Sequence, residues 1–167
     1  MGAGKTTMGR QIAKRLNMDF EDSDHVIEEC TGVDIPLIFE IEGEVGFRKR
    51  ETTVLDALTK TSPLVLATGG GVVLAEKNRQ FLRSRGLVIY LHSDIKYLLG
   101  RVSHDKNRPL LQTADPAATL KEIMSIREPL YRETADIVIN TGQQPIRAVV
   151  NIILDKIKTY NLNSGSI

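Results

Sequence analysis

The chain has 167 residues, enough for one domain with a single hydrophobic core, and its 41% hydrophobic and 26% charged residues are typical of a globular protein. Its 22 Lys and Arg residues balance 21 Asp and Glu residues, without the basic excess typical of nucleic-acid-binding proteins. One cysteine excludes an intrachain disulfide and suits a reducing cytosol, and no apolar run approaches the roughly 20 residues that span a bilayer. We therefore expect a cytoplasmic monomer that handles a small molecule and has no nucleic-acid or membrane partner.

Strand-like and helix-like segments alternate along the chain, a pattern typical of a parallel sheet covered by helices. The predicted strands span residues 18–21, 64–67, 87–91 and 136–140, and 87–91 is expected to be buried. The predicted helices span residues 6–16, 35–41, 46–58, 78–85, 95–102, 120–127 and 145–160, and one more begins at a Ser23 or Asp24 cap and ends at Cys30. Residues 103–115 are polar and irregular, which predicts a mobile loop.

The chain opens with a glycine-rich segment suited to binding phosphate. Its sequence, Gly2-Ala3-Gly4-Lys5-Thr6-Thr7, matches the second half of G-x-x-x-x-G-K-[ST], the phosphate-binding loop. Glycines let successive backbone N–H groups turn towards the phosphates, Lys5 would reach the outer phosphates, and the Thr6 hydroxyl would bind Mg²⁺. The Lys-Thr pair favours this interpretation over a glycine-rich helix start without a ligand.

The phosphate-binding motif is incomplete at its N-terminal side. Its first glycine, and the apolar strand that feeds such a loop from the middle of a parallel sheet, would lie before Met1. A sheet without that strand should leave a large buried gap and unpaired backbone on both neighbouring strands. We therefore expect that Met1 is an internal methionine of the natural protein.

Two carboxylates, Asp22 and Asp24, follow the strand predicted at residues 18–21. At a strand end near the phosphate loop, one can hold Mg²⁺ through water and the other can orient or deprotonate an attacking hydroxyl. A helix cap is the structural alternative for an Asp-Ser-Asp segment. Together with the phosphate loop, this pattern indicates Mg-ATP-dependent phosphoryl transfer to a small alcohol.

Six segments resemble shikimate kinases in order and spacing, and the resemblance extends over essentially the whole chain except for the absent first strand. They are residues 1–7, 22–24, 46–48, 69–71, 108–111 and 127–132. The resemblance implies a P-loop NTPase fold of the nucleoside-monophosphate-kinase-like type, a three-layer α/β/α single domain over residues 1–167 with a parallel sheet. It also implies transfer of the ATP γ-phosphate to the 3-hydroxyl of shikimate in chorismate and aromatic amino acid biosynthesis.

The resemblance assigns roles to individual residues. Lys5, Asp24 and Arg108 would be catalytic, with Arg108 in a lid at about residues 103–115 that closes over ATP. The shikimate-binding residues would be Asp24, Arg48, Gly69, Gly70, Gly71 and Arg127. The ATP-binding residues would be Gly2, Ala3, Gly4, Lys5, Thr6, Thr7, Arg101, Arg108 and Gln144, and Mg²⁺ would be held by Thr6 and Asp22.

Alternatives to these assignments stay open. Arg101 and Arg108 could be ordinary surface charges, and Arg48 lies in a charged run, residues 48–51, that is also typical of a solvated helix face. Kinases for other small hydroxy acids such as gluconate share the scaffold, although Arg48 and Arg127 beside the triple glycine favour shikimate. A regulatory nucleotide-binding module would be expected to lack Asp24 or Arg108. The chain could also be an inactive, truncated form of an active enzyme.

Overall fold

The structure is a computed structural model that describes residues 3–102, 113 and 115–163. Its strands are β1 (Asp19–Asp22), β2 (Leu64–Ala67), β3 (Ile89–His92) and β4 (Ile137–Asn140). Its helices are α1 (Lys5–Leu16), α2 (Ser23–Thr31), α3 (Ile35–Leu58), α4 (Glu76–Arg85), α5 (Ile95–Val102), α6 (Pro116–Thr134) and α7 (Ile146–Asn163), with a short 3₁₀ helix, η1 (Val72–Leu74). None of the described helices is both long and apolar enough to cross a lipid bilayer.

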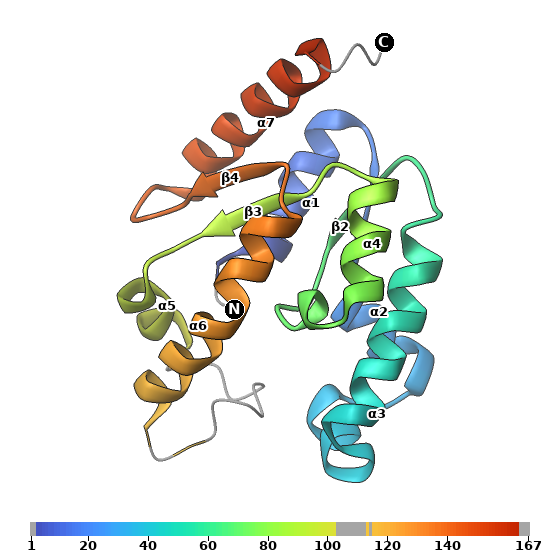
Figure 1. Cartoon of the computed structure of the whole chain (residues 1–167). Coiled ribbons are helices and arrows are strands. Elements are labelled where there is room, and N and C mark those ends of the chain that lie inside the picture. The colour runs from blue at the N-terminus through green and yellow to red at the C-terminus, as the bar shows by residue number, and fades with distance from the viewer. Residues whose placement is uncertain (1–2, 103–112, 114, 164–167) are drawn as a thin grey trace.

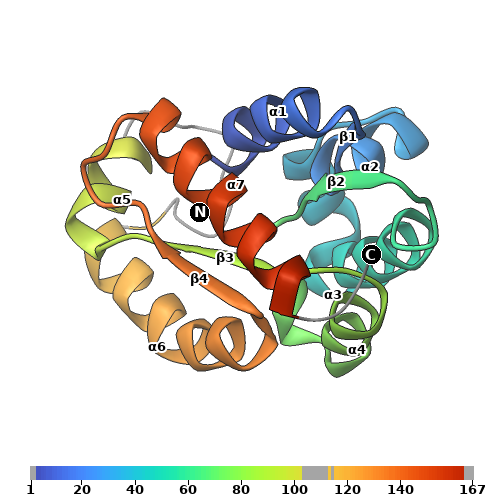
Figure 2. The same ribbon diagram turned by 90° about the horizontal axis from the view of Figure 1, so that it is seen from above.

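The four described strands form two parallel pairs that are not hydrogen-bonded to each other. β1 pairs with β2 so that Asp19 lies opposite Leu64, and β3 pairs with β4 so that Ile89 lies opposite Ile137. Seen from above, the two pairs lie next to each other with α7 crossing in front of the region between them (Figure 2). The predicted parallel arrangement of strands alternating with helices is therefore confirmed (Figure 1).

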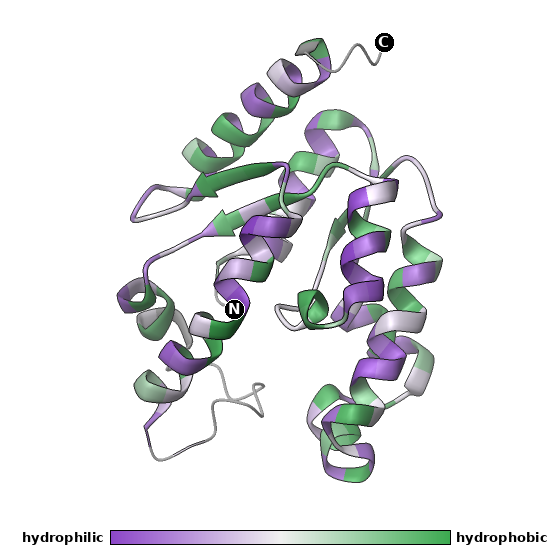
Figure 3. Cartoon of the chain, viewed as in Figure 1, coloured by the Kyte–Doolittle hydropathy of each residue, from purple (hydrophilic) through white to green (hydrophobic). Residues whose placement is uncertain are grey.

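Helices cover both faces of the strands. On one face, α1 and α7 bury a cluster that packs against alternate residues of β2 and β3, Val65, Ile89 and Leu91. On the other face, α3, α4, α6 and η1 pack around Leu66 and Tyr131. Strands covered on both faces need apolar side chains at successive positions, which is why β2, β3 and β4 are largely hydrophobic in Figure 3.

A cavity of about 250 Å³ lies between β2 and β3. Its lining includes Leu64 and Leu66 from β2 and Ile89 and Leu91 from β3. The expected gap between two neighbouring strands is therefore present in the described part of the chain. The prediction of a buried strand at residues 87–91 was wrong. The strand is Ile89–His92, and each of its residues is only partly buried. The reason is that one edge of this strand faces the cavity.

Two helix predictions need correction. The predicted helix at residues 120–127 is the middle of α6, which begins at an Asp115 cap and continues through Pro129 to Thr134. Proline inside a helix removes one hydrogen bond, and here the buried face that includes Leu120 and Thr134 stabilises the helix on both sides of it. The cap of α2 is Asp22, whose side chain accepts a hydrogen bond from the Asp24 N–H, rather than Ser23 or Asp24.

The two helices predicted at residues 35–41 and 46–58 are the two arms of α3, which is kinked at Gly43. Gly43 has φ 67° and ψ −177°, a backbone conformation that is almost restricted to glycine. An added Cβ would meet no atom within 4 Å, so any cost of a side chain here comes from the backbone alone.

We predict that Gly43→Ala lowers the free energy of unfolding by about 1–3 kcal/mol, measured by urea denaturation. The matched control is Gly86→Ala, since Gly86 also has open space around it but has an extended backbone with φ −172°. The control should leave the free energy of unfolding unchanged or raise it by about 0.4–1 kcal/mol. Equal destabilisation by both substitutions would contradict the strain assigned to Gly43.

Candidate functional site

The predicted phosphate-loop residues lead directly into α1. Gly4 is the N-cap with φ 79°, and its carbonyl accepts a hydrogen bond from the Met8 N–H at 3.0 Å. Ala3 is buried, whereas Thr6 and Thr7 are exposed on the first turn. The first-turn N–H groups of a helix have no partner within the helix and carry partial positive charge, an arrangement suited to phosphate oxygens.

The two residues predicted to hold Mg²⁺ are in contact. The Thr6 hydroxyl on α1 donates a 2.7 Å hydrogen bond to the Asp22 carboxylate at the end of β1. Hydroxyl and carboxylate oxygens are donors that Mg²⁺ prefers, so these side chains fit the ion. Among the described residues no cluster of three or more His, Cys, Asp or Glu side chains is placed to hold a metal. A Mg²⁺ bound here would therefore complete its coordination with water and phosphate oxygens.

Asp24 lies in the first turn of α2, and its carboxylate approaches the triple glycine. A Cβ added to Gly69 would lie 2.6 Å from Asp24 Oδ1 and 3.0 Å from Glu51 Oε1, so glycine is required for this approach. The Gly69 N–H also donates to the buried Ser23 hydroxyl at 3.3 Å. The cap and the functional interpretation of Asp22-Ser23-Asp24 are thus compatible, because Asp22 provides the cap and Asp24 faces the glycine loop.

Arg48 on α3 also lies against the triple glycine. Its guanidinium is bound on one side by Glu51 at 2.8 Å and on another by Glu44 at 2.8 Å. A Cβ added to Gly71 would come within 2.2 Å of the Arg48 Nη1, so any side chain at position 71 would displace the guanidinium. Burial opposes the charge of Arg48, but the carboxylates of Glu51 and Glu44 outweigh this and raise the pKa of Arg48.

Glu51 is a site residue that the sequence interpretation missed. Its side chain is 1% exposed, and no donor in the described part of the chain reaches its Oε1. Burial raises the pKa of Glu51 above its ordinary value, the positive charge of Arg48 opposes this shift, and the Asp24 carboxylate adds to it. The available sequence signal was the three-residue spacing to Arg48, which places both side chains on one face of α3.

Arg127 brings a second buried cation to the same place from α6. It is 5% exposed, and it lies close enough to Glu51 and to Tyr131 to act against the rise in the pKa of both groups. The Tyr131 hydroxyl in turn donates a hydrogen bond to the Gly70 carbonyl. The structure therefore brings Asp24, Arg48 and Arg127 together around the triple glycine from three different helices.

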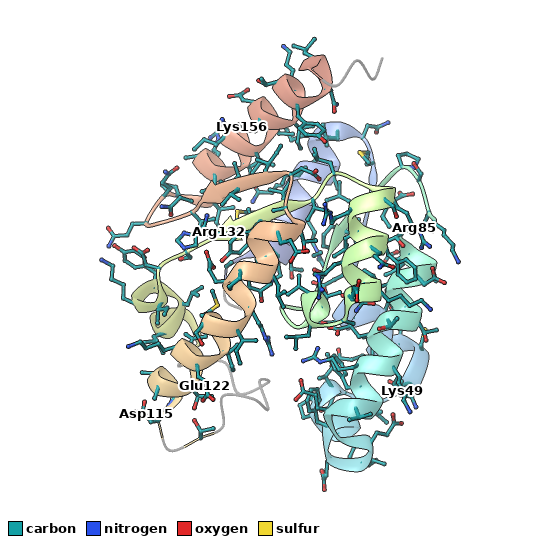
Figure 4. The ribbon with its side chains drawn as sticks, viewed as in Figure 1. Lys49, Arg85, Asp115, Glu122, Arg132 and Lys156 are labelled. Atoms are coloured by element: carbon teal, nitrogen blue, oxygen red, sulfur yellow. The ribbon has the colours of Figure 1, made fainter. Side chains whose placement is uncertain are left out.

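Two other arginines, both visible in Figure 4, support the framework around these residues. Arg85, at the end of α4, donates to the Asp56 carboxylate of α3 at 2.7 Å and so ties the two helices together. Arg132 on α6 donates to Glu128 one turn earlier at 2.7 Å. Neither arginine has a contact with the triple glycine in the described part of the chain.

Several predicted site residues cannot be compared with this geometry. Gly2, Arg108 and most of the predicted lid lie outside the described residues. Arg101 lies in the last turn of α5, but its side chain is not among those described. Gln144 is exposed before α7 and its backbone N–H donates to the Thr141 carbonyl at 3.1 Å. The nucleotide contacts assigned to these residues stay predictions.

We predict that Glu51→Gln gains stability relative to the unaltered chain as the pH rises from about 4 to 7. Because burial raises the pKa of Glu51, the folded state binds its proton more tightly than the unfolded state. The stability from this proton is complete below the unfolded pKa and is lost as the pH rises through the folded one, whereas glutamine does not titrate. Urea denaturation of both proteins at each pH measures the difference. The prediction would be contradicted if the difference in the free energy of unfolding between the two proteins were constant with pH, or if Glu51→Gln lost stability relative to the unaltered chain as the pH rises.

Comparison with known proteins gives consistent matches along the chain. A family model described as shikimate kinase matches residues 1–158. A shikimate kinase of Bordetella pertussis is 56% identical over 160 residues, which cover 96% of this chain and 76% of that protein. The structure of shikimate kinase from Acinetobacter baumannii in complex with shikimate superimposes with a TM-score of 0.95 at 52% identity, covering 97% of this chain and 90% of the other. A gluconokinase from Sinorhizobium meliloti superimposes with a TM-score of 0.59 at 16% identity, which shows a shared fold alone.

Proposed function

The chain belongs to the shikimate kinase family, and from this premise we propose that the residues around its triple glycine bind shikimate and direct the ATP γ-phosphate to the 3-hydroxyl. The observation that carries the proposal is the convergence of Asp24, Arg48 and Arg127 on residues 69–71. Two planar guanidinium groups and backbone N–H groups suit a carboxylate, and a nearby aspartate suits a hydroxyl. The guanidinium groups would therefore bind the carboxylate of the substrate, and its hydroxyl would face Asp24.

We assign the chemical steps to residues on both sides of this group. Asp24 would orient the shikimate hydroxyl and accept its proton as the phosphoryl group is transferred. Lys5 and the N–H groups of the phosphate loop would hold the outer ATP phosphates, and Thr6 and Asp22 would hold Mg²⁺, which neutralises phosphate charge when bound. Arg108 would stabilise the transferring phosphoryl group from the lid at residues 103–115, and Arg101 and Gln144 would contact the nucleotide.

The setting we propose for this reaction is a single domain, residues 1–167, that acts as a monomer in the cytoplasm. The near-zero net charge gives no support to a nucleic-acid partner, and the single cysteine, Cys30, is exposed, which suits a reducing compartment. A gluconate kinase is disfavoured because the similarity to a gluconokinase is limited to the fold, whereas a paired arginine clamp suits shikimate.

The test is ADP release by the chain with Mg-ATP, measured with shikimate, with gluconate and without an acceptor. We expect release to depend on shikimate and to stay at the acceptor-free rate with gluconate. The midpoint of thermal unfolding with and without shikimate gives a binding readout that does not depend on turnover. No increase in ADP release with shikimate would contradict the proposed reaction, and no thermal shift would contradict the proposed binding site.

A further inference from the structure

Tyr131 connects two parts of the proposed shikimate site through one hydroxyl. This hydroxyl donates to the Gly70 carbonyl. Arg127 lies one helical turn earlier on α6, close enough for its positive charge to act against the rise in the pKa of the Tyr131 hydroxyl. A tyrosine hydroxyl has one donor and can accept a hydrogen bond at the same time, whereas a guanidinium can only donate. The Tyr131 hydroxyl therefore joins α6 to the backbone of the glycine loop close to Arg127.

We propose that Tyr131 is a positioning residue for shikimate, because its hydroxyl holds the Gly70–Gly71 peptide in one orientation beside Arg127. The inference rests on the proposed function and assigns Tyr131 no contact with the reacting atoms. It predicts a specific role for this hydroxyl in the affinity for shikimate and none in the binding of ATP.

The triple glycine has unusual backbone freedom. Three consecutive glycines have more accessible backbone conformations than any other tripeptide, so they keep one conformation only where outside contacts hold them. Ser23 binds the Gly69 N–H, Tyr131 binds the Gly70 carbonyl, and Arg48 lies against Gly71. The Gly69 and Gly71 carbonyls also accept hydrogen bonds from the N–H groups of Val72 and Leu74. Tyr131 supplies the hydrogen bond at the central position.

The Tyr131 contact also fixes the direction of the Gly71 N–H. The peptide group is planar and trans, so the Gly70 carbonyl and the Gly71 N–H point in opposite directions. A carbonyl held towards Tyr131 therefore aims the Gly71 N–H away from α6. A peptide free to rotate would lose this orientation, and with it a donor of fixed direction for an anionic ligand.

Tyr131 is kept protonated and is supported by a neighbouring ring. Burial raises the pKa of the Tyr131 hydroxyl although Arg127 opposes the shift, so the hydroxyl keeps its proton and donates at neutral pH. The Tyr131 ring stacks on the Tyr90 ring with centroids 4.9 Å apart, which restricts its movement. The Tyr90 hydroxyl binds Glu128 instead and takes no part in the contacts of the glycine loop.

The test compares Tyr131→Phe with Tyr90→Phe, which removes the same hydroxyl from the neighbouring stacked ring. We expect Tyr131→Phe to raise the KM for shikimate about tenfold while the KM for ATP and kcat change by less than about twofold. Tyr90→Phe should leave the KM for shikimate within about twofold of the unaltered chain. An equal rise in both KM values, or the same rise in both variants, would overturn the inference.

A readout without substrate separates this inference from the proposed function. Amide hydrogen exchange at Gly70 and Gly71, measured by NMR, should be faster in Tyr131→Phe than in the unaltered chain, and unchanged in Tyr90→Phe. Unaltered exchange in Tyr131→Phe would overturn the positioning inference even where shikimate turnover is normal. An unaltered chain without shikimate-dependent turnover would overturn the proposed function and the shikimate part of the inference, while the exchange experiment would still report on the loop.

Discussion

Replacing Asp24 with asparagine is expected to lower kcat for shikimate by about 10²–10⁴-fold and to leave the KM for ATP within about threefold. Asparagine has nearly the volume of aspartate and keeps one oxygen acceptor, so the close approach to Gly69 is preserved. It lacks the negative charge and the basicity that a hydroxyl nucleophile needs. Steady-state kinetics with shikimate and ATP varied in turn measures both quantities.

The matched control for this prediction is Asp34→Asn. Asp34 caps α3 by accepting a hydrogen bond from the Leu37 N–H at 3.0 Å, and asparagine caps helices equally well. The control therefore makes the same chemical change near a helix start away from the triple glycine, and kcat should not change. A fall of less than about tenfold in Asp24→Asn would contradict the role of Asp24 in accepting the proton.

Replacing Arg48 with alanine is expected to raise the KM for shikimate by about 30- to 1,000-fold. The substitution removes a guanidinium that two carboxylates hold against Gly71, where we propose that it binds the acid group of shikimate. It also leaves the Glu51 carboxylate buried without its partner, which should lower the free energy of unfolding by about 3–5 kcal/mol. Kinetics and urea denaturation measure the two effects separately.

Three variants distinguish binding from stability in this prediction. The double variant Arg48→Ala with Glu51→Gln should be more stable than Arg48→Ala alone, because the Glu51 carboxylate is no longer buried without Arg48. Its affinity for shikimate should stay as low as that of Arg48→Ala. Gly71→Ala should raise the KM for shikimate with a smaller loss of stability, because its Cβ displaces only the end of the Arg48 side chain. Arg50→Ala, which breaks an exposed ion pair with Glu42, should change neither quantity. Recovery of shikimate affinity in the double variant would show that the role of Arg48 is structural.

The local elements of this fold depend on residues that are close in sequence, and they could be predicted. Helix α1 follows from its apolar spacing and from Gly4 at its start, and the predicted strand at residues 64–67 coincides with β2. The break in α3 was predicted as two helices at residues 35–41 and 46–58. The structure shows that the kink lies at Gly43, since a glycine can adopt a backbone conformation that other residues avoid. The phosphate-loop residues, Asp22 at the end of β1 and Asp24 in the first turn of α2 were likewise selected from residue types and spacing, and their roles stay predictions.

Features that depend on packing between distant segments could not be predicted from the same patterns. Glu51 belongs to a charged run typical of a solvated face, yet it is buried because that face of α3 packs against the triple glycine and α2. Pro129 marks a helix end by local rules, but α6 passes through it because its apolar face is buried on both sides. The partial burial of the β3 side chains depends on contacts with distant segments, which no local pattern encodes.

The sequence by itself determined the parallel α/β architecture, the phosphate loop, and the family to which the chain belongs, since these follow from short motifs in a definite order. The tertiary structure alone decided which charges share one buried environment, and it brought Glu51 and Tyr131 to Arg48, Arg127 and the triple glycine. The physical reason is that secondary structure depends on the spacing of apolar, polar and glycine residues over short stretches of sequence. Burial, the direction of a guanidinium and the pKa of a carboxyl depend instead on segments that meet only in the folded chain.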